Sequence, residues 1–301
     1  MKSRFIAAAA VAVALSAPAF AGTTLYSAYQ GSQHGVTERN GDSPTLDQSL
    51  AFSTGIDASG IAVTGTGNIY LSSANHLYNY QSNGTLVQDF AFPDPAINYT
   101  AVATKGATVY ATYTGSQHGV TERDLGLNQF AFFNTGVDAT GIAVGDGSHL
   151  YISAGHDLYD YLTDGSLVRD MTFPDPAVLY TGIAFADDLV FASYSGDQQG
   201  VTIRDLGLNQ IGLFGVNFDI SGIAAGHNHD LFLSSGNSLY HYTTAGTLLG
   251  SETFPDKNIF YKAVAVAPGV PEPASWAMML GGFGLMGGVM RGRRKAAVSF
   301  A

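Results

Sequence analysis

The sequence contains one unit of about 81 residues three times in succession. TGIDASGIAV from Thr54 is matched by TGVDATGIAV from Thr135 and by VNFDISGIAA from Val216, a constant step of 81 residues. The segment GSQHGVTER at residues 31–39 returns unchanged at 115–123 and as GDQQGVTIR at 196–204. A fixed period of this length indicates a repeat architecture, in which each copy buries its apolar residues against its neighbours.

Each unit divides into two similar halves, and each half contains four short runs rich in Val, Ile, Tyr, Phe and Thr. Gly, Asn, Asp and Ser separate these runs, which is typical of short β-strands joined by turns. Four strands in about 40 residues is the spacing of a propeller blade. Three double-blade units therefore predict an all-β fold, a six-bladed β-propeller.

The two ends of the repeat region predict how the ring closes. The sequence offers five innermost strands, at Gly60–Val63, Ala101–Thr104, Gly141–Val144, Gly182–Phe185 and Gly222–Ala225. The first blade, which begins at Thr24, has only its last three strands. We expect Lys262–Ala267 to supply the missing inner strand, because this pairing leaves no open inner edge.

The N-terminal residues 1–21 have the pattern of a secretory signal peptide. Lys2 and Arg4 precede an apolar run at residues 5–15, and Ala19-Phe20-Ala21 forms an A-x-A cleavage site. We expect the mature protein to begin at Gly22 and its propeller body to span residues 22–268.

The C-terminal residues 269–301 have the pattern of a membrane anchor. Pro271-Glu272-Pro273 precedes an apolar, glycine-rich segment at 274–290 that contains Trp276 and Ala277. The basic residues Arg291, Arg293 and Arg294 follow. Seventeen residues are the lower limit for a transmembrane helix, and arginines that follow such a helix stay on the cytoplasmic side.

These C-terminal residues closely resemble the PEP-CTERM sorting signal of exported bacterial proteins, in the variant P-E-P-x-x-W-A. The resemblance covers about the last thirty residues. It implies recognition by a membrane-embedded exosortase, a transient inner-membrane anchor, removal of the tail, and display of the body at the cell surface or its release. Proteins with unrelated folded bodies carry the same tail, so the signal directs sorting and specifies no activity.

The composition of the body limits its partners. It holds 23 Asp and Glu against seven Lys and Arg, a net charge of about −16, and the chain has no cysteine. Such a charge argues against nucleic acid as a partner, because the phosphates would be repelled. Stability must come from burial without disulfides.

One face of the predicted propeller collects the polar residues that recur between copies. In a propeller, the loop between the second and third strands of a blade lies on the same face as the loop to the next blade. The candidate binding residues on this face are His34, His118, Gln199, His156, Asp57, Asp138, Asp219, Asp94, Asp175 and Asp256.

Two interpretations of these residues remain open. Carboxylates could hold Ca²⁺, and histidine with carboxylate could hold a transition metal. Alternatively, each aspartate accepts hydrogen bonds from its own loop in an Asx-turn, the interpretation that we favour. Gln199 in the third copy excludes a threefold histidine site.

The sequence favours a binding or structural module over an enzyme. It contains no nucleophile elbow, phosphate-binding glycine loop or H-E-x-x-H helix. Near-identical repeats keep symmetric residues, whereas catalysis needs asymmetric ones. We therefore expect a surface module that engages polysaccharide, a partner protein or divalent cations. The alternative is a metal-assisted hydrolase or lactonase. Arg39, Arg123 and Arg204 are expected in salt bridges or at a solvated edge.

Overall fold

A computed structural model of the chain describes residues 22–226 and 230–267. Gly22–Pro268 form one compact unit. The predicted signal peptide and the predicted sorting tail with its apolar segment lie outside the described residues.

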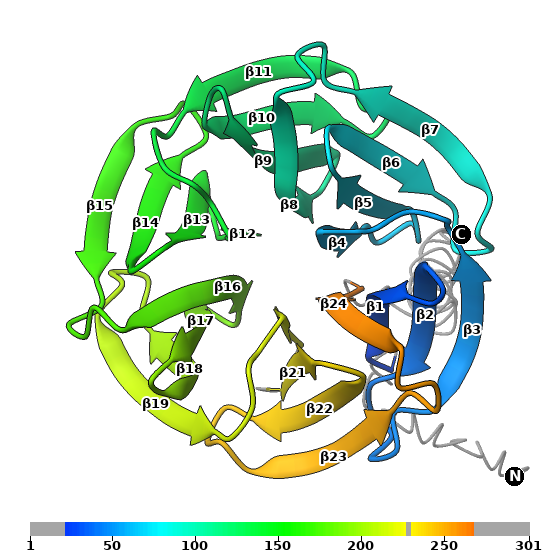
Figure 1. Cartoon of the computed structure of the whole chain (residues 1–301). Helices are drawn as coiled ribbons and strands as arrows, with labels where there is room; N and C mark the ends of the chain where they lie inside the picture. Colours follow the sequence, from blue (N-terminus) through cyan, green and yellow to red (C-terminus); the bar gives the residue numbers. More distant parts are fainter. Residues whose placement is uncertain (1–21, 227–229, 268–301) are drawn as a thin grey trace, which may run out of the picture. The chain divides into compact units, whose positions relative to one another are not determined.

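The described residues form six four-stranded antiparallel sheets arranged in a ring (Figure 1). The strands are given from the inside of each blade outward. Blade 1 contains β24 (Ile259–Val266), β1 (Thr24–Gly31), β2 (Gly35–Asn40) and β3 (Gln48–Ser53). Blade 2 contains β4 (Gly60–Val63), β5 (Ile69–Ser73), β6 (His76–Tyr80) and β7 (Leu86–Ala91). Blade 3 contains β8 (Ile97–Lys105), β9 (Thr108–Gly115), β10 (Gly119–Asp124) and β11 (Gln129–Asn134).

The other three blades repeat this order. Blade 4 contains β12 (Gly141–Val144), β13 (His149–Ala154), β14 (Asp157–Leu162) and β15 (Leu167–Thr172). Blade 5 contains β16 (Val178–Ala186), β17 (Leu189–Gly196), β18 (Gln199–Arg204) and β19 (Gln210–Val216). Blade 6 contains β20 (Gly222–Ala225), β21 (Asp230–Ser235), β22 (Ser238–Thr243) and β23 (Leu248–Thr253). The predicted all-β, six-bladed propeller is confirmed.

The chain's last described strand lies in the first blade. β24 pairs antiparallel with β1, with Val264 opposite Ser27 and Val266 opposite Leu25. The first blade is thus built from both ends of the body, and its inner strand comes from the segment that follows blade 6.

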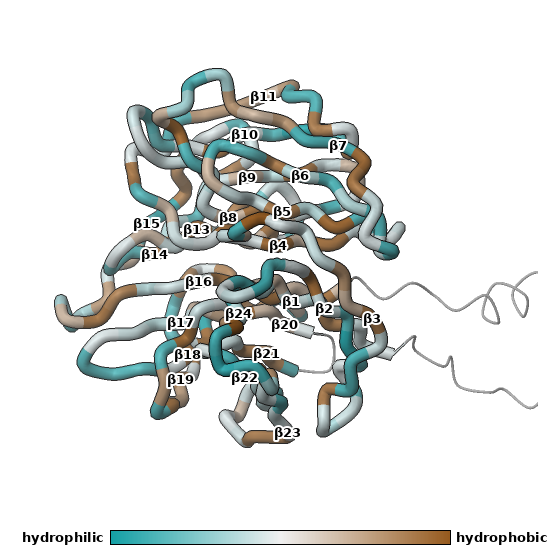
Figure 2. The backbone as a smooth tube through the Cα atoms, turned by 45° about the vertical axis from the view of Figure 1, so that its right-hand side comes forward, coloured by the Kyte–Doolittle hydropathy of each residue, from teal (hydrophilic) through white to brown (hydrophobic). Residues whose placement is uncertain are grey.

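The hydrophobic core lies between neighbouring blades. One buried cluster, for example, joins Tyr70 of blade 2 to Tyr99 and Tyr113 of blade 3, each at most 1% exposed. The rings of Tyr99 and Tyr113 both contact Phe92, which precedes the inner strand of blade 3. Figure 2 shows hydrophobic stretches on the inner strand β4 and also on the outer strand β11.

The recurrent arginines are buried, which corrects the expectation of a solvated edge. Arg39, Arg123 and Arg204 are 1%, 0% and 3% exposed. The Arg123 guanidinium donates to the Leu127 carbonyl (2.8 Å) and to the Tyr99 hydroxyl (2.9 Å). Leu127 has a φ of 60°, so the arginine satisfies the carbonyl of a left-handed turn.

The three copies differ in what lies against this arginine. Arg39 forms the expected salt bridge, 3.1 Å from Glu252 of blade 6. Arg123 instead lies over the ring of Phe90, 3.8 Å from its centroid. These guanidinium groups are therefore paired inside the body and are not exposed to solvent.

The glutamate of the motif G-V-T-E-R also has different surroundings in the two copies that contain it, and it is buried in the second copy but only half-buried in the first. Glu38 accepts hydrogen bonds from the Tyr26 hydroxyl (2.7 Å) and from Ser49 Oγ (2.8 Å). Glu122 is 6% exposed, its Oε1 has no partner, and burial raises the pKa of its carboxyl. Phe130 stands where the first copy has Ser49. The third copy has Ile203 in place of the glutamate.

Candidate functional site

The histidines of the repeated motif each meet an aspartate from the following inter-blade loop. His34 Nε2 lies 3.0 Å from Asp57 Oδ1, and His118 Nδ1 lies 2.9 Å from Asp138 Oδ1. The side chains of His34 and His118 are 32% and 31% exposed, and those of their aspartates are more than 70% exposed. We call the face that carries these pairs the histidine face.

The contact of His118 with Asp138 is not a well-aligned hydrogen bond. The two atoms are close, yet His118 Nδ1 has no hydrogen-bond partner of acceptable geometry. Because both aspartates are largely exposed, water screens the attraction and each pair stabilises the fold only weakly.

The third copy and the intervening blade are arranged differently. Gln199 Nε2 donates to the carbonyl of Gly196 in its own loop (3.0 Å). His156 Nδ1 lies 2.6 Å from the carbonyl of Val178, on the neighbouring blade. Asp219 is exposed on the loop that leads to β20. The candidate residues therefore form two separate histidine–aspartate pairs, without a common centre.

The other three candidate aspartates form the Asx-turns that the sequence favours. Asp94, Asp175 and Asp256 each accept a backbone N–H from two residues further along, at 2.9 Å. The Ala96 N–H, with help from Ser116, holds the pKa of Asp94 below its ordinary value. The Asn258 N–H and the Ser32 hydroxyl do the same for the pKa of Asp256. These side chains fix the entry of the chain into the next inner strand.

Metal binding needs more ligands than these pairs supply. Within residues 22–226 and 230–267, no three His, Cys, Asp or Glu side chains are grouped so that they could hold a metal ion. The hydrolase alternative requires such a convergence. Binding of Ca²⁺ or another ligand at the histidine face stays a prediction.

A ring of six branched aliphatic side chains narrows the central channel, one from each inner strand. All six are 5% to 7% exposed; they are Ile61, Val102, Ile142, Ile183, Ile223 and Val264. Five of them line both of the channel's cavities, so the ring lies between the two. The cavity on the side of the histidine face has a volume of only about 100 Å³.

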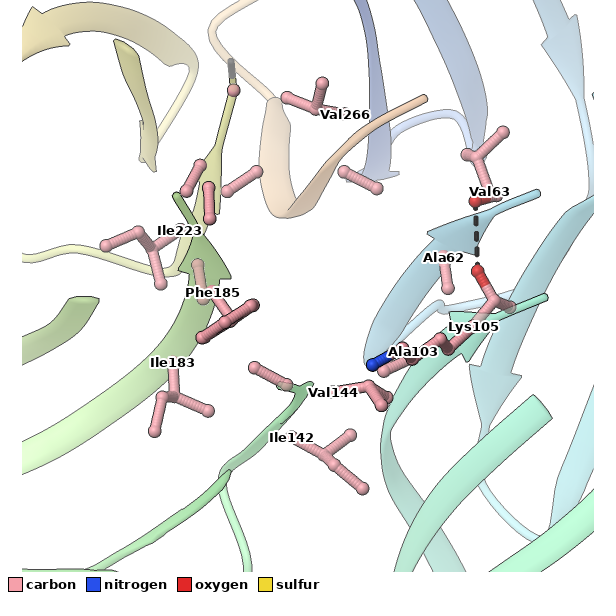
Figure 3. Close-up of a pocket in the computed structure, with 18 of the residues that line it drawn as sticks. Ala62, Val63, Ala103, Lys105, Ile142, Val144, Ile183, Phe185, Ile223 and Val266 are labelled. Carbon is pink, nitrogen blue, oxygen red and sulfur yellow. Dashed lines mark hydrogen bonds between the residues drawn. The ribbon is translucent and has the colours of Figure 1, made fainter. Parts of the chain in front are cut away.

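The larger cavity, about 500 Å³, opens at the opposite end of the channel. We call it the far cavity. Its wall is mainly aliphatic, and Figure 3 shows Ile142, Val144, Ile183 and Ile223 around it from three blades. Its volume falls in the range of small-molecule sites, which are typically apolar with a few placed polar groups.

The polar groups of the far cavity come from the turns that follow the inner strands. Lys105 Nζ hydrogen-bonds the carbonyl of Gly145 and lies 3.7 Å from Asp146 Oδ1, so it links blade 3 to blade 4. Asp187 and Asp188 of blade 5 also line the cavity. Among the described residues of this rim, one cation faces three carboxylates, which gives them a net negative charge.

The rim is asymmetric although the blades are repeats. Blade 3 has Lys105-Gly106-Ala107 where blade 5 has Ala186-Asp187-Asp188. Asp187 and Asp188 have φ values of 51° and 61°. Both values lie in the left-handed region of backbone conformation, which glycine adopts more readily than other residues. The far cavity and its charged rim were not among the sites predicted from the sequence. The signal that could have revealed it is the divergence of the copies at the ends of their inner strands.

Comparison with known proteins identifies the C-terminal segment. Residues 269–295 match the model of the PEP-CTERM protein-sorting motif. This chain carries a PEP-CTERM sorting signal. The motif indicates an exported protein that an exosortase processes, with a transient membrane anchor in its tail and a propeller as its body. The recognised residues Pro271, Glu272, Pro273, Trp276, Ala277, Arg291, Arg293 and Arg294 all lie in the matched range.

Solved structures resemble the body in fold alone. The chain is similar to a protein of unknown function from Bacteroides caccae, at 11% identity and TM-score 0.66, with 81% of this chain and 98% of that chain covered. It is also similar to a chain of a nidogen/laminin complex, at 14% identity and TM-score 0.67, with 82% and 99% covered. The Pan2 WD40 domain of Neurospora crassa gives 10% identity and TM-score 0.52, with 69% and 68% covered. No curated protein matches the sequence.

Among the described residues, no helix has the length and hydrophobicity needed to cross a bilayer. The predicted segment 274–290 lies outside them.

Proposed function

We propose that the PEP-CTERM protein is a binding module, displayed at the cell surface or released there, and that its ligand buries an aliphatic group in the far cavity. The observation that carries this proposal is the aliphatic cavity of about 500 Å³, at whose base the ring of Ile and Val side chains narrows the channel. Burial of apolar surface is the main driving force available to such a wall.

The chemistry of the wall selects among the partners expected from the sequence. A sugar presents hydroxyl groups all round and needs many hydrogen-bonding partners, whereas this wall consists mainly of Ile, Val and Ala. A divalent cation needs several oxygen ligands at one point. An aliphatic side chain of a partner protein, or a small molecule with an alkyl chain, fits the wall better than a polysaccharide or a metal ion.

The excess of carboxylates on the rim of the far cavity favours a positively charged ligand. Asp146, Asp187 and Asp188 outnumber Lys105, whose ammonium group is already bonded to blade 4. The body as a whole is strongly acidic. A ligand that pairs its alkyl chain with a positive end is therefore favoured over one with a negative end.

Calorimetry with n-alkylammonium ions tests the proposal on the exported protein. Each added CH₂ should strengthen binding by up to about fourfold, because burying one CH₂ is worth about 0.8 kcal/mol. The matching n-alkylcarboxylates should bind more weakly. Absence of a chain-length dependence in both series would contradict an aliphatic site.

Two variants locate the site. Thr104→Phe narrows the far cavity and copies Phe185, its counterpart in blade 5, so the fold tolerates an aromatic residue there. We expect this variant to weaken alkylammonium binding. His34→Ala, on the opposite face, is the control and should bind as the unmodified protein does. If His34→Ala weakened binding and Thr104→Phe did not, the binding site would lie on the histidine face.

A further inference from the structure

The outer strands of the six blades are unequal in how they protect their free edges. An outer strand leaves a row of backbone N–H and C=O groups unpaired, and proteins guard such edges with charged residues or proline. β7, β15 and β23 each contain charged residues, namely Asp89, Arg169 with Asp170, and Glu252. β3 (QSLAFS), β11 (QFAFFN) and β19 (QIGLFGV) contain neither a charge nor a proline.

Of these, β11 and β19 also expose large apolar side chains in alternation. Phe130 and Phe132 of β11 are each 61% exposed, and Ile211 and Leu213 of β19 are 59% and 58% exposed. The residues that alternate with them are less exposed: Phe133, for example, follows Phe132 and packs against Tyr161 of the next blade. β11 and β19 therefore each present an unprotected edge flanked by an apolar stripe.

The first copy shows that the fold does not require these side chains. β3 occupies the same place in blade 1, and it has Ser49 and Ala51 where β11 has Phe130 and Phe132. The inward residue is phenylalanine in all three copies, as Phe52, Phe133 and Phe214. Packing thus explains the inward residue, and the outward stripe needs another explanation.

We propose that the unprotected edges of β11 and β19 pair with the same edges of further copies of this chain. The chain itself supplies both halves of such a contact, since the two strands have similar length and the same alternation of exposed apolar residues. Antiparallel pairing across the edges places aromatic and branched aliphatic side chains side by side, an arrangement that stabilises sheets. Neither edge adds like charges to the contact, which matters for a body of about −16.

The positions of the edges determine the form of the assembly. β11 and β19 lie on different sides of the ring (Figure 1), so one copy can use both at once. Contacts on two separate edges produce open chains of molecules and no closed dimer. Each contact is small beside the roughly 800 Å² per partner of a stable interface. The assembly is therefore weak in dilute solution and grows with protein concentration.

Sedimentation velocity of the exported protein over a range of concentrations tests this proposal. We expect the mean mass to rise with concentration beyond that of a dimer. The double variant Phe132→Lys/Leu213→Lys should stay monomeric at every concentration, because both edges then carry a charge. Its melting temperature should match that of the unmodified protein, since both side chains are more than half exposed.

Ala51→Lys is the matched control, because it adds a positive charge at the equivalent position of β3. It should leave the association unchanged. A protein that stays monomeric at all concentrations would overturn the proposal. Association that survives in the double variant would do the same, because it would arise from another surface, such as an unprocessed tail.

Discussion

Replacing Glu122 by isoleucine should make the protein more stable at neutral pH. Glu122 is 6% exposed, and its Oε1 has no hydrogen-bond partner. In the first copy Ser49 donates a hydrogen bond to the equivalent carboxylate of Glu38, but the second copy has Phe130 in place of that serine. A buried charged group without a partner costs about 1–3 kcal/mol or more. Isoleucine fits, because the third copy has Ile203 at this position, with Phe191 in place of Tyr110.

The expected gain is about 2 kcal/mol, which for a domain of this size corresponds to a rise of about 4–8 °C in the melting temperature. The gain should depend on pH. Burial raises the folded-state pKa of Glu122 above the value of 4.5 for an unburied glutamate. Below that value the carboxyl is protonated in both states and costs little. As the pH rises through the higher folded-state pKa, ionisation penalises only the folded state, so stability is lost.

Thermal melts of the variant and the unmodified protein at pH 4 and pH 7.5 measure this effect. The difference in melting temperature should be small at pH 4 and largest at pH 7.5. Glu38→Ile is the matched control in the first copy, where both carboxylate oxygens accept hydrogen bonds. That variant should lose stability, about 1–3 kcal/mol, because it leaves the buried Tyr26 hydroxyl unpaired. A Glu122→Ile protein no more stable than the original at pH 7.5, or a gain independent of pH, would refute the reasoning.

Two further predictions concern the ends of the body. Deleting Lys262–Ala267 removes most of β24, including the buried Val264, and should lower the melting temperature of the whole body by tens of degrees, since typical domains hold only about 5–15 kcal/mol in total; an unchanged melt would show that β24 does not hold the ring together. Mass spectrometry of the exported protein should find a chain that begins at Gly22 and lacks the basic residues Arg291, Arg293 and Arg294, because the signal peptide and the sorting tail are removed; peptides containing these arginines in surface material would contradict sorting by an exosortase.

The sequence alone determined the number of blades and the presence of a sorting signal. Its 81-residue period and the turn residues between short β-rich runs are local features, so they predict strands without knowledge of tertiary contacts. The segment Lys262–Ala267 was predicted as an inner strand from the blade count, and all of it except Ala267 lies within β24, which ends at Val266. The sorting signal is linear as well, since it is read as a segment of chain.

Only the tertiary structure decided which side chains are buried, paired or available. Arg123 has the sequence pattern of an exposed strand residue, but it is fully buried because its hydrogen bonds reach the Leu127 carbonyl and the Tyr99 hydroxyl across the blade. The far cavity depends on six inner strands whose ends converge from positions up to about 200 residues apart. The burial of a side chain and the convergence of inner strands both depend on contacts between residues distant in sequence. A repeat pattern predicts the strands of each blade, but it does not predict those contacts.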